Sequence, residues 1–382
     1  MIDRIKSFLV KGRESFLVIE DFGAGFVVTG GTADNKNKKV KVSRTNFVES
    51  LKEIKKPLLP VDKLILAMDS RRAFTAESTI NLKRNEPEEP IKETELDTLV
   101  FRGLWEFLNR YRGTAAKKLG CNDLDLVLAA AEIREVLIGS HKVFNPLGFK
   151  GEDLSFRYRG TFISREQKES FERMENWSRE KIIIEGGAIL ALSFPQSPEY
   201  FAFVRDKNTE IFAKNKESQL HFKSVPWGSG RILKKIGLLF GVDDETALDI
   251  VLSLNRSSPA GKIKAAIDKK IKEEVSGLIK LLPKPSATTR KFSGGKKGPG
   301  VYLSFDLPFI FLKKFVGGAV SFVDFRELLT EQGYGVIINQ ENEEFLNVGD
   351  TLVFITHVYS PPQYKFLNEL LARRARWLTV KP

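Results

Sequence analysis

The chain has few of the residues that disulfides and metal centres require. Among its 382 residues there is one cysteine, Cys121, which excludes an internal disulfide and a cysteine-rich metal site. The three histidines, His141, His221 and His357, are far apart in the sequence, which argues against a metal cluster. We expect Cys121 to be a buried spectator, with a reactive thiol as the alternative.

Long apolar runs are also missing. No stretch is long enough to cross a bilayer, and no signal peptide with a cleavage pattern is visible. Together with the single cysteine, these absences predict a cytoplasmic protein. The sequence shows no internal repeat as identity and no recognisable nucleic-acid-binding module.

The chain does have an excess of positive charge. Its 61 lysines and arginines against 49 aspartates and glutamates give a net charge of +12. This charge predicts an anionic partner, either a membrane surface or an acidic peptide, and no nucleic acid is expected because no module for it is present. The apolar share of 42% is normal for a globular protein, and 382 residues are too many for one small core, so we expect two or more domains.

The most informative stretch is a turn at residues 145–151, Asn-Pro-Leu-Gly-Phe-Lys-Gly. Pro146 fixes its own φ angle, and Gly148 and Gly151 permit turn angles closed to other residues, so a tight connection between two strands is predicted. The segments around the turn predict an inserted α+β subdomain over residues 71–164. Its expected elements are strands at 74–83, 124–138 and 154–163 and a helix from residue 90 towards 112.

The rest of the chain alternates between strand and helix patterns. Strands are expected at 16–29 (two, around a glycine turn), 64–68, 181–184, 199–212, 221–223, 301–305, 336–339 and 352–355. Helices are expected at 46–54, 165–179, 186–192, 228–239, 244–254, 262–282 and from 362 onward. Polar loops are expected at 35–41 and 284–300.

This order of elements resembles FtsA and PilM, two families of bacterial actin-like proteins. The turn at 145–151 is similar to an Asn-Pro-x-Gly-x-x-Gly segment in the inserted subdomain of FtsA. Residues 225–232, Val-Pro-Trp-Gly-Ser-Gly-Arg-Ile, look like the family's Val-Pro-x-Gly-Gly-x-x-Ile, and a helix similar to the family's follows at 244–250. Residues 20–25, Glu-Asp-Phe-Gly-Ala-Gly, stand where the family has its first phosphate loop, Leu-Asp-x-Gly-Thr.

The resemblance implies an α/β fold of the actin, Hsp70 and sugar-kinase superfamily, with two domains and an inserted α+β subdomain in the first. The expected parts are an amphipathic N-terminal segment (1–15), a first actin-like domain (16–70 and 165–195), the insert (71–164), a second actin-like domain with a shortened outer subdomain (196–360) and a basic amphipathic C-terminal helix (361–382).

In that family two β-hairpins hold the phosphates of ATP, and carboxylates hold Mg²⁺. Here Ala24 replaces the hydroxyl residue of the first hairpin, and a phenylalanine stands at the carboxylate position of the second. The expected remnants of the phosphate loops are Asp21, Gly23, Arg205, Lys207, Thr209 and Gly228. The expected cleft-filling side chains are Phe203, Leu248 and Phe305. The departures predict an occluded site with no catalytic residue, no metal and no cofactor; the alternative is a cleft that still holds ATP and Mg²⁺.

Both ends of the chain are amphipathic and basic, which predicts contact with an anionic membrane. The expected membrane residues are Ile5, Phe8 and Leu9 near the start and Leu370, Arg373, Arg374 and Trp377 near the end. The competing interpretation, for each end, is a helix packed on the body of the protein.

In FtsA the inserted subdomain contacts the next subunit of a filament, so the resemblance predicts self-association through the insert. The expected contact residues are Asn145, Gly148, Gly151, Arg157 and Arg159, the two arginines lying on a strand taken to be exposed. The alternative is that the turn residues serve only the folding of the insert.

The function that the resemblance favours is a non-catalytic actin-like scaffold at the inner face of the cytoplasmic membrane, in bacterial cell division. One alternative is a PilM-like platform for pilus or secretion assembly, and another is an active ATPase with unconventional site residues. The expected partners are a second copy of the chain, an anionic membrane surface and a peptide of a division or pilus-assembly protein.

Overall fold

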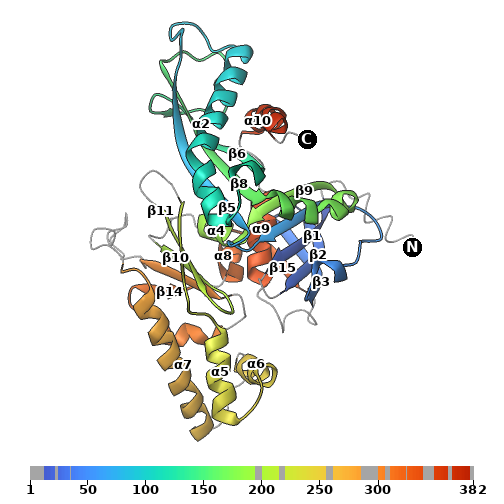
Figure 1. The fold of residues 1–382 in the computed structure, drawn as a ribbon, viewed down its shortest axis with the longest axis vertical. Coiled ribbons are helices and arrows are strands. Elements are labelled where there is room, and N and C mark those ends of the chain that lie inside the picture. Colours follow the sequence, from blue (N-terminus) through green and yellow to red (C-terminus); the bar gives the residue numbers. More distant parts are fainter. Residues whose placement is uncertain are drawn as a thin grey trace.

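The computed structural model describes residues 13–21, 25–34, 36–193, 200–214, 220–254, 261–284, 300–305, 310–323, 325–338, 348–359 and 364–378. These residues form an elongated molecule with three β-sheets (Figure 1). The sheet of the insert lies at one end, and helices α5 (Gly230–Phe240), α6 (Asp244–Ser253) and α7 (Gly261–Leu281) lie at the other.

The first domain is built on a six-stranded sheet of order β15-β3-β2-β1-β4-β9. Its strands are β1 (Arg13–Asp21), β2 (Phe26–Asp34), β3 (Lys39–Val48), β4 (Val61–Met68), β9 (Ser178–Glu185) and β15 (Gly335–Ile338). Strands β1, β2 and β3 form an antiparallel meander, and β4 and β9 run parallel to β1. Because both faces of the sheet are covered, β1 and β4 read as unbroken apolar runs rather than as alternating patterns.

Helices cover both faces of this sheet. One face packs against α4 (Gly186–Leu192), α8 (Phe325–Glu331) and α9 (Val348–Tyr359). The other face packs against α3 (Arg165–Ser170) and the 3-10 helix η3 (Glu172–Trp177), through Phe171, Met174 and Trp177. Ser164 starts α3 with a reciprocal capping box to Gln167, which satisfies backbone donors at the start of the helix.

The second domain repeats the topology of the first. Its five strands, in the order β12-β11-β10-β13-β14, are β10 (Tyr200–Val204), β11 (Thr209–Lys214), β12 (Leu220–Val225), β13 (Val301–Phe305) and β14 (Val320–Phe322). Here too an antiparallel meander of three strands is followed by two strands parallel to its first. The same order and directions occur twice in one chain, which confirms the predicted two-domain, actin-like α/β fold.

The insert has its own sheet, of order β5-β8-β6-β7, with all neighbours antiparallel. Its strands are β5 (Ala73–Lys83), β6 (Leu126–Ile138), β7 (His141–Lys142) and β8 (Asp153–Ser164), and the long helix α2 (Glu93–Leu119) covers one face. The glycine turn joins β7 to β8, with positive φ angles at Gly148 (81°) and Gly151 (155°) as predicted.

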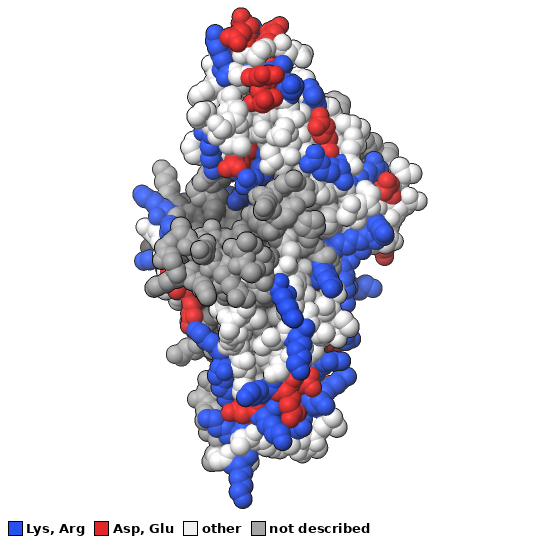
Figure 2. All heavy atoms as spheres, turned by 90° about the vertical axis from the view of Figure 1, so that its left-hand side faces the viewer, with Lys and Arg blue, Asp and Glu red and all other residues white. Residues whose placement is uncertain are grey.

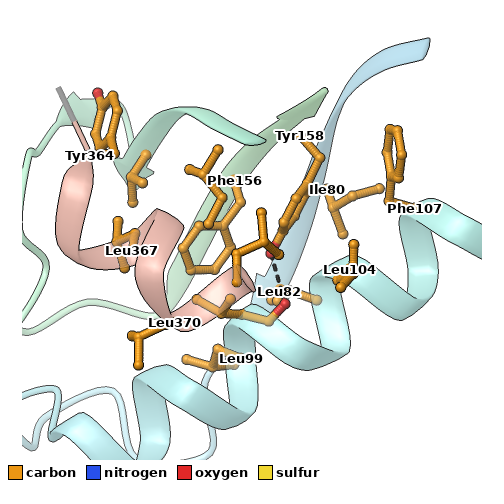
Figure 3. Close-up of a cluster of buried hydrophobic side chains, with 14 of the residues drawn as sticks. Ile80, Leu82, Leu99, Leu104, Phe107, Phe156, Tyr158, Tyr364, Leu367 and Leu370 are labelled. Atoms are coloured by element: carbon orange, nitrogen blue, oxygen red, sulfur yellow. Dashed lines mark hydrogen bonds between the residues drawn. The ribbon is translucent and has the colours of Figure 1, made fainter. Parts of the chain in front are cut away.

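A C-terminal helix, α10 (Lys365–Leu378), completes the core of the insert (Figure 3). Its apolar face carries Leu367 and Leu370, which point towards Phe156 of β8 and Leu99 of α2. Tyr364, just before the helix, packs its ring against Phe144. The last part of the chain is thus packed on a unit that lies roughly 200 residues earlier in the sequence.

Three element predictions are wrong. Residues 46–54, predicted as a helix, continue β3 to Val48 and then form a 3-10 turn, because buried valines alternate with exposed lysines from residue 39. Residues 352–355, predicted as a strand, are part of α9; this short apolar run is buried on all sides, so its periodicity carries no information. Residues 165–179, predicted as one helix, divide into α3, η3 and the start of β9.

The predicted end of the second domain at residue 360 is also too late. Strand β15 pairs in parallel with β3, and α9 packs on the first-domain sheet, so the chain has returned to the first domain by residue 335. Strand β14 and helix α8 were not predicted, since both are short and lie in sequence of mixed pattern.

Candidate functional site

A buried cluster of charges lies where the two domains meet. Three neighbouring parallel strands, β1, β4 and β9, end at the same edge of the first sheet, and each ends in or is followed by a carboxylate: Glu20 and Asp21, Asp69, and Glu185. This edge is where ligands bind in open α/β sheets. All four carboxylate residues are no more than 1% exposed.

The second domain contributes a hairpin, β10–β11, that faces these carboxylates. Arg205, which follows β10, is 1% exposed, and its guanidinium nitrogens lie 3.8 Å from Glu20 Oε1 and 3.9 Å from Glu210 Oε2. The guanidinium also lies 4.1 Å from the ring centroid of Phe203. Glu210 of β11 accepts a hydrogen bond from Ser70 Oγ at 3.0 Å, which ties this hairpin to the first domain.

The remaining carboxylates are paired with basic side chains of the first domain and the insert. Arg71 Nε donates to Asp69 at 2.8 Å, Arg72 donates to Asp21 at 3.1 Å, and Lys118 of α2 lies 3.0 Å from Glu185. Glu185 also accepts the backbone N–H of Thr75 at the start of the insert. The cluster therefore joins both domains and the insert through charge-assisted hydrogen bonds.

Burial sets the protonation of the cluster. It raises the pKa of Glu210 to about 7, with the charges of Asp69 and Glu185 adding to the rise and Arg205 opposing it. Burial acts in the same direction on Asp69, but the hydrogen bond from Arg71 and the charge of Arg205 outweigh it, and the pKa of Asp69 is lowered.

The glycine motif at 228–230 supports the hairpin. The N–H of Ser229 donates to Arg205 O at 2.9 Å, and the N–H of Gly230 donates to Asp206 O at 2.9 Å. A Cβ on Gly228 would come within 2.1 Å of Asp206 O, so only glycine fits there. The N-terminal N–H groups of α5 are thus used by the chain itself.

The structure brings together only some of the predicted site residues. Asp21, Phe203 and Arg205 belong to the cluster. Thr209 is buried and donates to Trp227 O at 2.7 Å, and Lys207 is exposed at the hairpin tip.

Leu248 and Phe305 do not reach the cluster. Phe305 stacks on Phe322 in the core of the second domain, and Leu248 packs on the same core. Among the described contacts, these two predicted cleft-filling side chains thus pack in the core of the second domain. Gly23 lies outside the described residues.

Sequence reasoning missed Asp69, Glu185 and Glu210. A signal was present for two of them. Asp69 follows the apolar strand β4 and Glu185 ends the apolar run of β9, where parallel strands present their carboxyl ends. No group of three or more metal-ligating side chains is found in the part of the chain that the structure describes.

A cavity lies between the first domain and the insert. It has a volume of about 310 Å³ and is lined by residues of β9, the outermost strand of the first sheet, and of β6, β8, α9 and α10. Its lining combines apolar with polar and charged side chains: Lys63, Ala130, Ala131, Glu132, Arg159, Thr161, Glu180, Ile182, Ile184, Ile189, His357, Val358 and Asn368. Burial holds the pKa of His357 well below its usual value, and the positive charges of Arg159 and Arg134 add to this shift.

The residues predicted for self-association have partners within the insert. Arg159 is 7% exposed and forms a buried ion pair with Glu77 at 2.7 Å, so the prediction that it lies on an exposed face is wrong. Arg157 is half-buried and lies 2.7 Å from Glu135. Both are cross-strand pairs, because Glu77 of β5 stands opposite Arg159 and Glu135 of β6 stands opposite Arg157 on β8.

The turn residues Asn145, Gly148 and Gly151 are held by local hydrogen bonds. Asn145 Oδ1 accepts from Leu147 N at 3.1 Å, Gly148 N donates to Ile91 O at 3.0 Å, and Gly151 N donates to the carbonyl of residue 87 at 3.0 Å. These contacts fasten the turn to the loop before α2, as the folding alternative predicts.

The C-terminal helix does not offer its apolar face to solvent. Leu370 is 1% exposed in the insert core, and Arg374 donates to Asp97 of α2. The predicted membrane role of Leu370 is therefore wrong, and the alternative of a docked helix holds. Arg373 is exposed, whereas the side chain of Trp377 and residues 5, 8 and 9 lie outside the described part.

No protein-family model and no curated protein sequence matches the chain. Among solved structures, it aligns with a PilM–PilN type IV pilus biogenesis complex over 96% of its length and 99% of the other chain, at 11% identity and a TM-score of 0.40. With ethanolamine utilization protein EutJ from Carboxydothermus hydrogenoformans the shares are 91% and 90%, at 11% identity and a TM-score of 0.37. With AMPPNP-bound MreB 5 of Spiroplasma citri they are 93% and 98%, at 9% identity and a TM-score of 0.33.

Within the described residues, no helix has both the length and the apolar character needed to cross a membrane.

Proposed function

We propose that this protein is a non-catalytic, actin-like scaffold whose two domains are held together by its own side chains rather than by a nucleotide. The observation that supports the proposal most directly is the position of the Arg205 guanidinium. The guanidinium lies among Glu20, Glu210 and Asp69 at the edge of the sheet where an actin-like ATPase would hold Mg²⁺ and phosphate. A fixed cation of the chain here supplies the positive charge that the carboxylates need when they are buried.

The hairpin supports the same proposal. Phosphate loops expose backbone N–H groups to the ligand, and glycine lets the backbone come close. In this chain the N–H groups of Ser229 and Gly230 are bonded to the hairpin carbonyls, and the hairpin itself carries Arg205, Asp206 and Lys207 in place of glycines. Among the described residues, this hairpin and the start of α5 therefore offer few backbone donors to a triphosphate.

Calorimetric titration with Mg-ATP tests the proposal. The expected result is no heat of binding, and no rise in melting temperature with ATP, because only a ligand that binds the native state stabilises it. ATP turnover in the purified protein that disappears in Asp21→Ala, and persists in Lys207→Ala at the exposed hairpin tip, would establish an active ATPase. Turnover that is equal in both variants comes from a contaminant.

The scaffold is proposed to act at the inner face of the cytoplasmic membrane, in cell division, and to associate with itself. What supports a membrane role is the net charge of +12 and the basic, amphipathic start of the sequence. Self-association is tested by sedimentation in solution and on lipid. A protein that stays monomeric on both would contradict the division scaffold.

A PilM-like platform for pilus or secretion assembly is the second candidate, and the cavity between β9 and β6 favours it. Strand β9 is an outermost strand. Among the described strands, the edge of β6 away from β8 pairs only with two residues of β7, and Asn368 of α10 is hydrogen-bonded to both backbone groups of Ile133. The stretches of these two edges that are unpaired among the described residues lie beside the cavity, and they can accept an extended peptide by strand addition.

Two peptides distinguish the candidates: the acidic tail of a tubulin-like division protein and the cytoplasmic segment of a pilus-assembly membrane protein. A platform binds the second, and Ala130→Arg at the cavity wall abolishes that binding. Leu124→Arg, at a residue of the insert that is 75% exposed, is the matched control and should leave binding unchanged.

A further inference from the structure

Two adjacent leucines stand out on the surface of the first domain. Leu58 is 93% exposed and Leu59 is 61% exposed, and no other large apolar side chain in the described part of the chain is as exposed as Leu58. Single apolar residues on a surface need no explanation, but a neighbouring pair presented this fully does.

The local sequence explains why the pair points away from the body. The segment is Lys55-Lys56-Pro57-Leu58-Leu59-Pro60, between the buried anchor Ile54 and the first residue of β4. Each proline fixes its own φ angle and biases the preceding residue, Lys56 or Leu59, towards extended angles. The backbone of this apolar turn is therefore restrained on both sides of Leu58.

Basic side chains lie around the turn. Lys55 and Lys56 directly precede it and are exposed. Asp62, just after it, accepts from Ser15 N at 2.8 Å and lies 3.2 Å from Arg179, whose side chain is 76% exposed. On the face shown in Figure 2, basic side chains are scattered over the whole length of the molecule with acidic ones among them. Charge alone does not mark a surface, but here it accompanies an apolar tip.

The start of the chain enters the fold beside this turn. Strand β1 begins at Arg13, and the Ser15–Asp62 hydrogen bonds place that start next to the residues that follow the turn. The twelve residues before Arg13 contain Ile5, Phe8 and Leu9 among basic residues. Two apolar and basic stretches, one of them outside the described residues, are thus attached at the same edge of the first sheet.

We propose that the Leu58–Leu59 turn inserts into the interface of an anionic bilayer, with Lys55 and Lys56 against the lipid phosphates. The inference rests on the proposed membrane role and names the surface that performs it. A pair of leucines enters the acyl region while the lysines stay at the level of the headgroups, which is the arrangement that interfacial segments use.

Vesicle partitioning tests the proposal on the full chain. The probe is a vesicle of phosphatidylcholine with phosphatidylglycerol, and the test variant is Leu58→Ser combined with Leu59→Ser. We expect lipid affinity to fall at least about tenfold, because the leucines lose apolar burial in the bilayer. Lys55→Glu with Lys56→Glu should weaken binding by about fivefold or more for each lysine and remove much of its salt dependence.

Matched controls separate this surface from general stickiness. Leu238→Ser removes a leucine that is 80% exposed on α5 of the second domain, and it should leave the affinity within about twofold. Brominated lipid should quench the fluorescence of the tryptophan introduced by Leu58→Trp, whereas it should not quench that introduced by Leu238→Trp. Circular dichroism should show all variants folded, since the replaced side chains are exposed.

Several outcomes would overturn the proposal. One is that the double leucine variant binds vesicles as tightly as the wild type. This includes the case in which binding is lost only when residues 2–11 are deleted. Another is a double leucine variant that melts at a lower temperature with unchanged lipid binding, because the turn would then be covered by the chain itself. Absence of binding to any anionic vesicle would also reject it. None of these results bears on the nucleotide titration, so the two proposals fail separately.

Discussion

Replacing Arg205 by methionine should destabilise the protein more than any other single change in the hairpin. The guanidinium lies 3.8 Å from Glu20 and 3.9 Å from Glu210, and at an effective dielectric constant of about 20 each attraction amounts to about 4 kcal/mol. The desolvation of the guanidinium offsets part of this sum. The net cost of removing one partner from a buried ionic group is about 3–5 kcal/mol, and we expect a loss in this range at pH 7.

The pH dependence identifies the cause of that loss. Without Arg205 the pKa of Glu210 rises above its present value of about 7, because the guanidinium charge now lowers it. Protonated Glu210 needs no cation, so the difference in unfolding free energy between Arg205→Met and the wild type should be largest above pH 7. The difference should shrink as the pH falls towards 5.

Urea unfolding at pH 5, 6, 7 and 8 measures this effect. Lys207→Met, on the same hairpin but exposed, is the control and should change stability by less than about 0.5 kcal/mol. Adding Glu210→Gln to Arg205→Met should restore part of the loss. A cost below about 1 kcal/mol, or one that is the same at every pH, would refute the view that Arg205 neutralises this cluster.

Three further changes test other parts of the structure. Glu210→Gln should remove a pH dependence of stability between about pH 4.5 and 7. Because the pKa of Glu210 in the folded state is raised to about 7, the wild type loses roughly 3 kcal/mol of stability as the pH rises through this window. The midpoint of urea unfolding should show that slope only in the wild type. Gly103→Ala should lower the free energy of thermal unfolding by about 1–3 kcal/mol, because its Cβ would come within 2.5 Å of the Tyr158 hydroxyl. Gly113→Ala on the same helix, with nothing within 4 Å of its Cβ, should raise it by about 0.5–1 kcal/mol. Equal effects would show that α2 is not closely packed at residue 103. Asn368→Ala should lower the free energy of unfolding by about 1–3 kcal/mol, because its amide both accepts from and donates to the backbone of β6. Amide hydrogen exchange in β6 should become faster in this variant, and unchanged exchange would show that the contact does not form.

Most strands of the two domains could be predicted from the sequence, because their apolar runs stand between polar turns. Their repeated order was not predicted, since it depends on pairing between distant residues. The apolar strands at 16–29, 64–68 and 199–212 stand out against polar turns, and the glycines of 145–151 mark their turn directly. Residues 352–355 could not be assigned in this way. A fully buried helix and a fully buried strand give the same short apolar run, and only the packing of α9 distinguishes them.

The site was predictable only in part. Arg205 was identified because it stands where the resemblance expects a glycine, but its partner Glu20 lies 185 positions earlier, and no local pattern links the two. The buried pairing of Arg159 with Glu77 was hidden for a similar reason. A lone arginine on an alternating strand reads as exposed unless the sheet on its other side is known.

The docking of α10 has a consequence for how the protein is made. The strands and helix of the insert end at Ser164, yet its hydrophobic core includes Tyr364, Leu367 and Leu370. At a synthesis rate of about 5–20 residues per second, roughly 200 more residues take on the order of 10–40 s to appear. During that time the nascent insert must carry an uncovered apolar groove beside an unpaired stretch of β6. A ribosome-bound chain that stops before residue 364 should therefore be a substrate for chaperones, and the last helix should be what releases it.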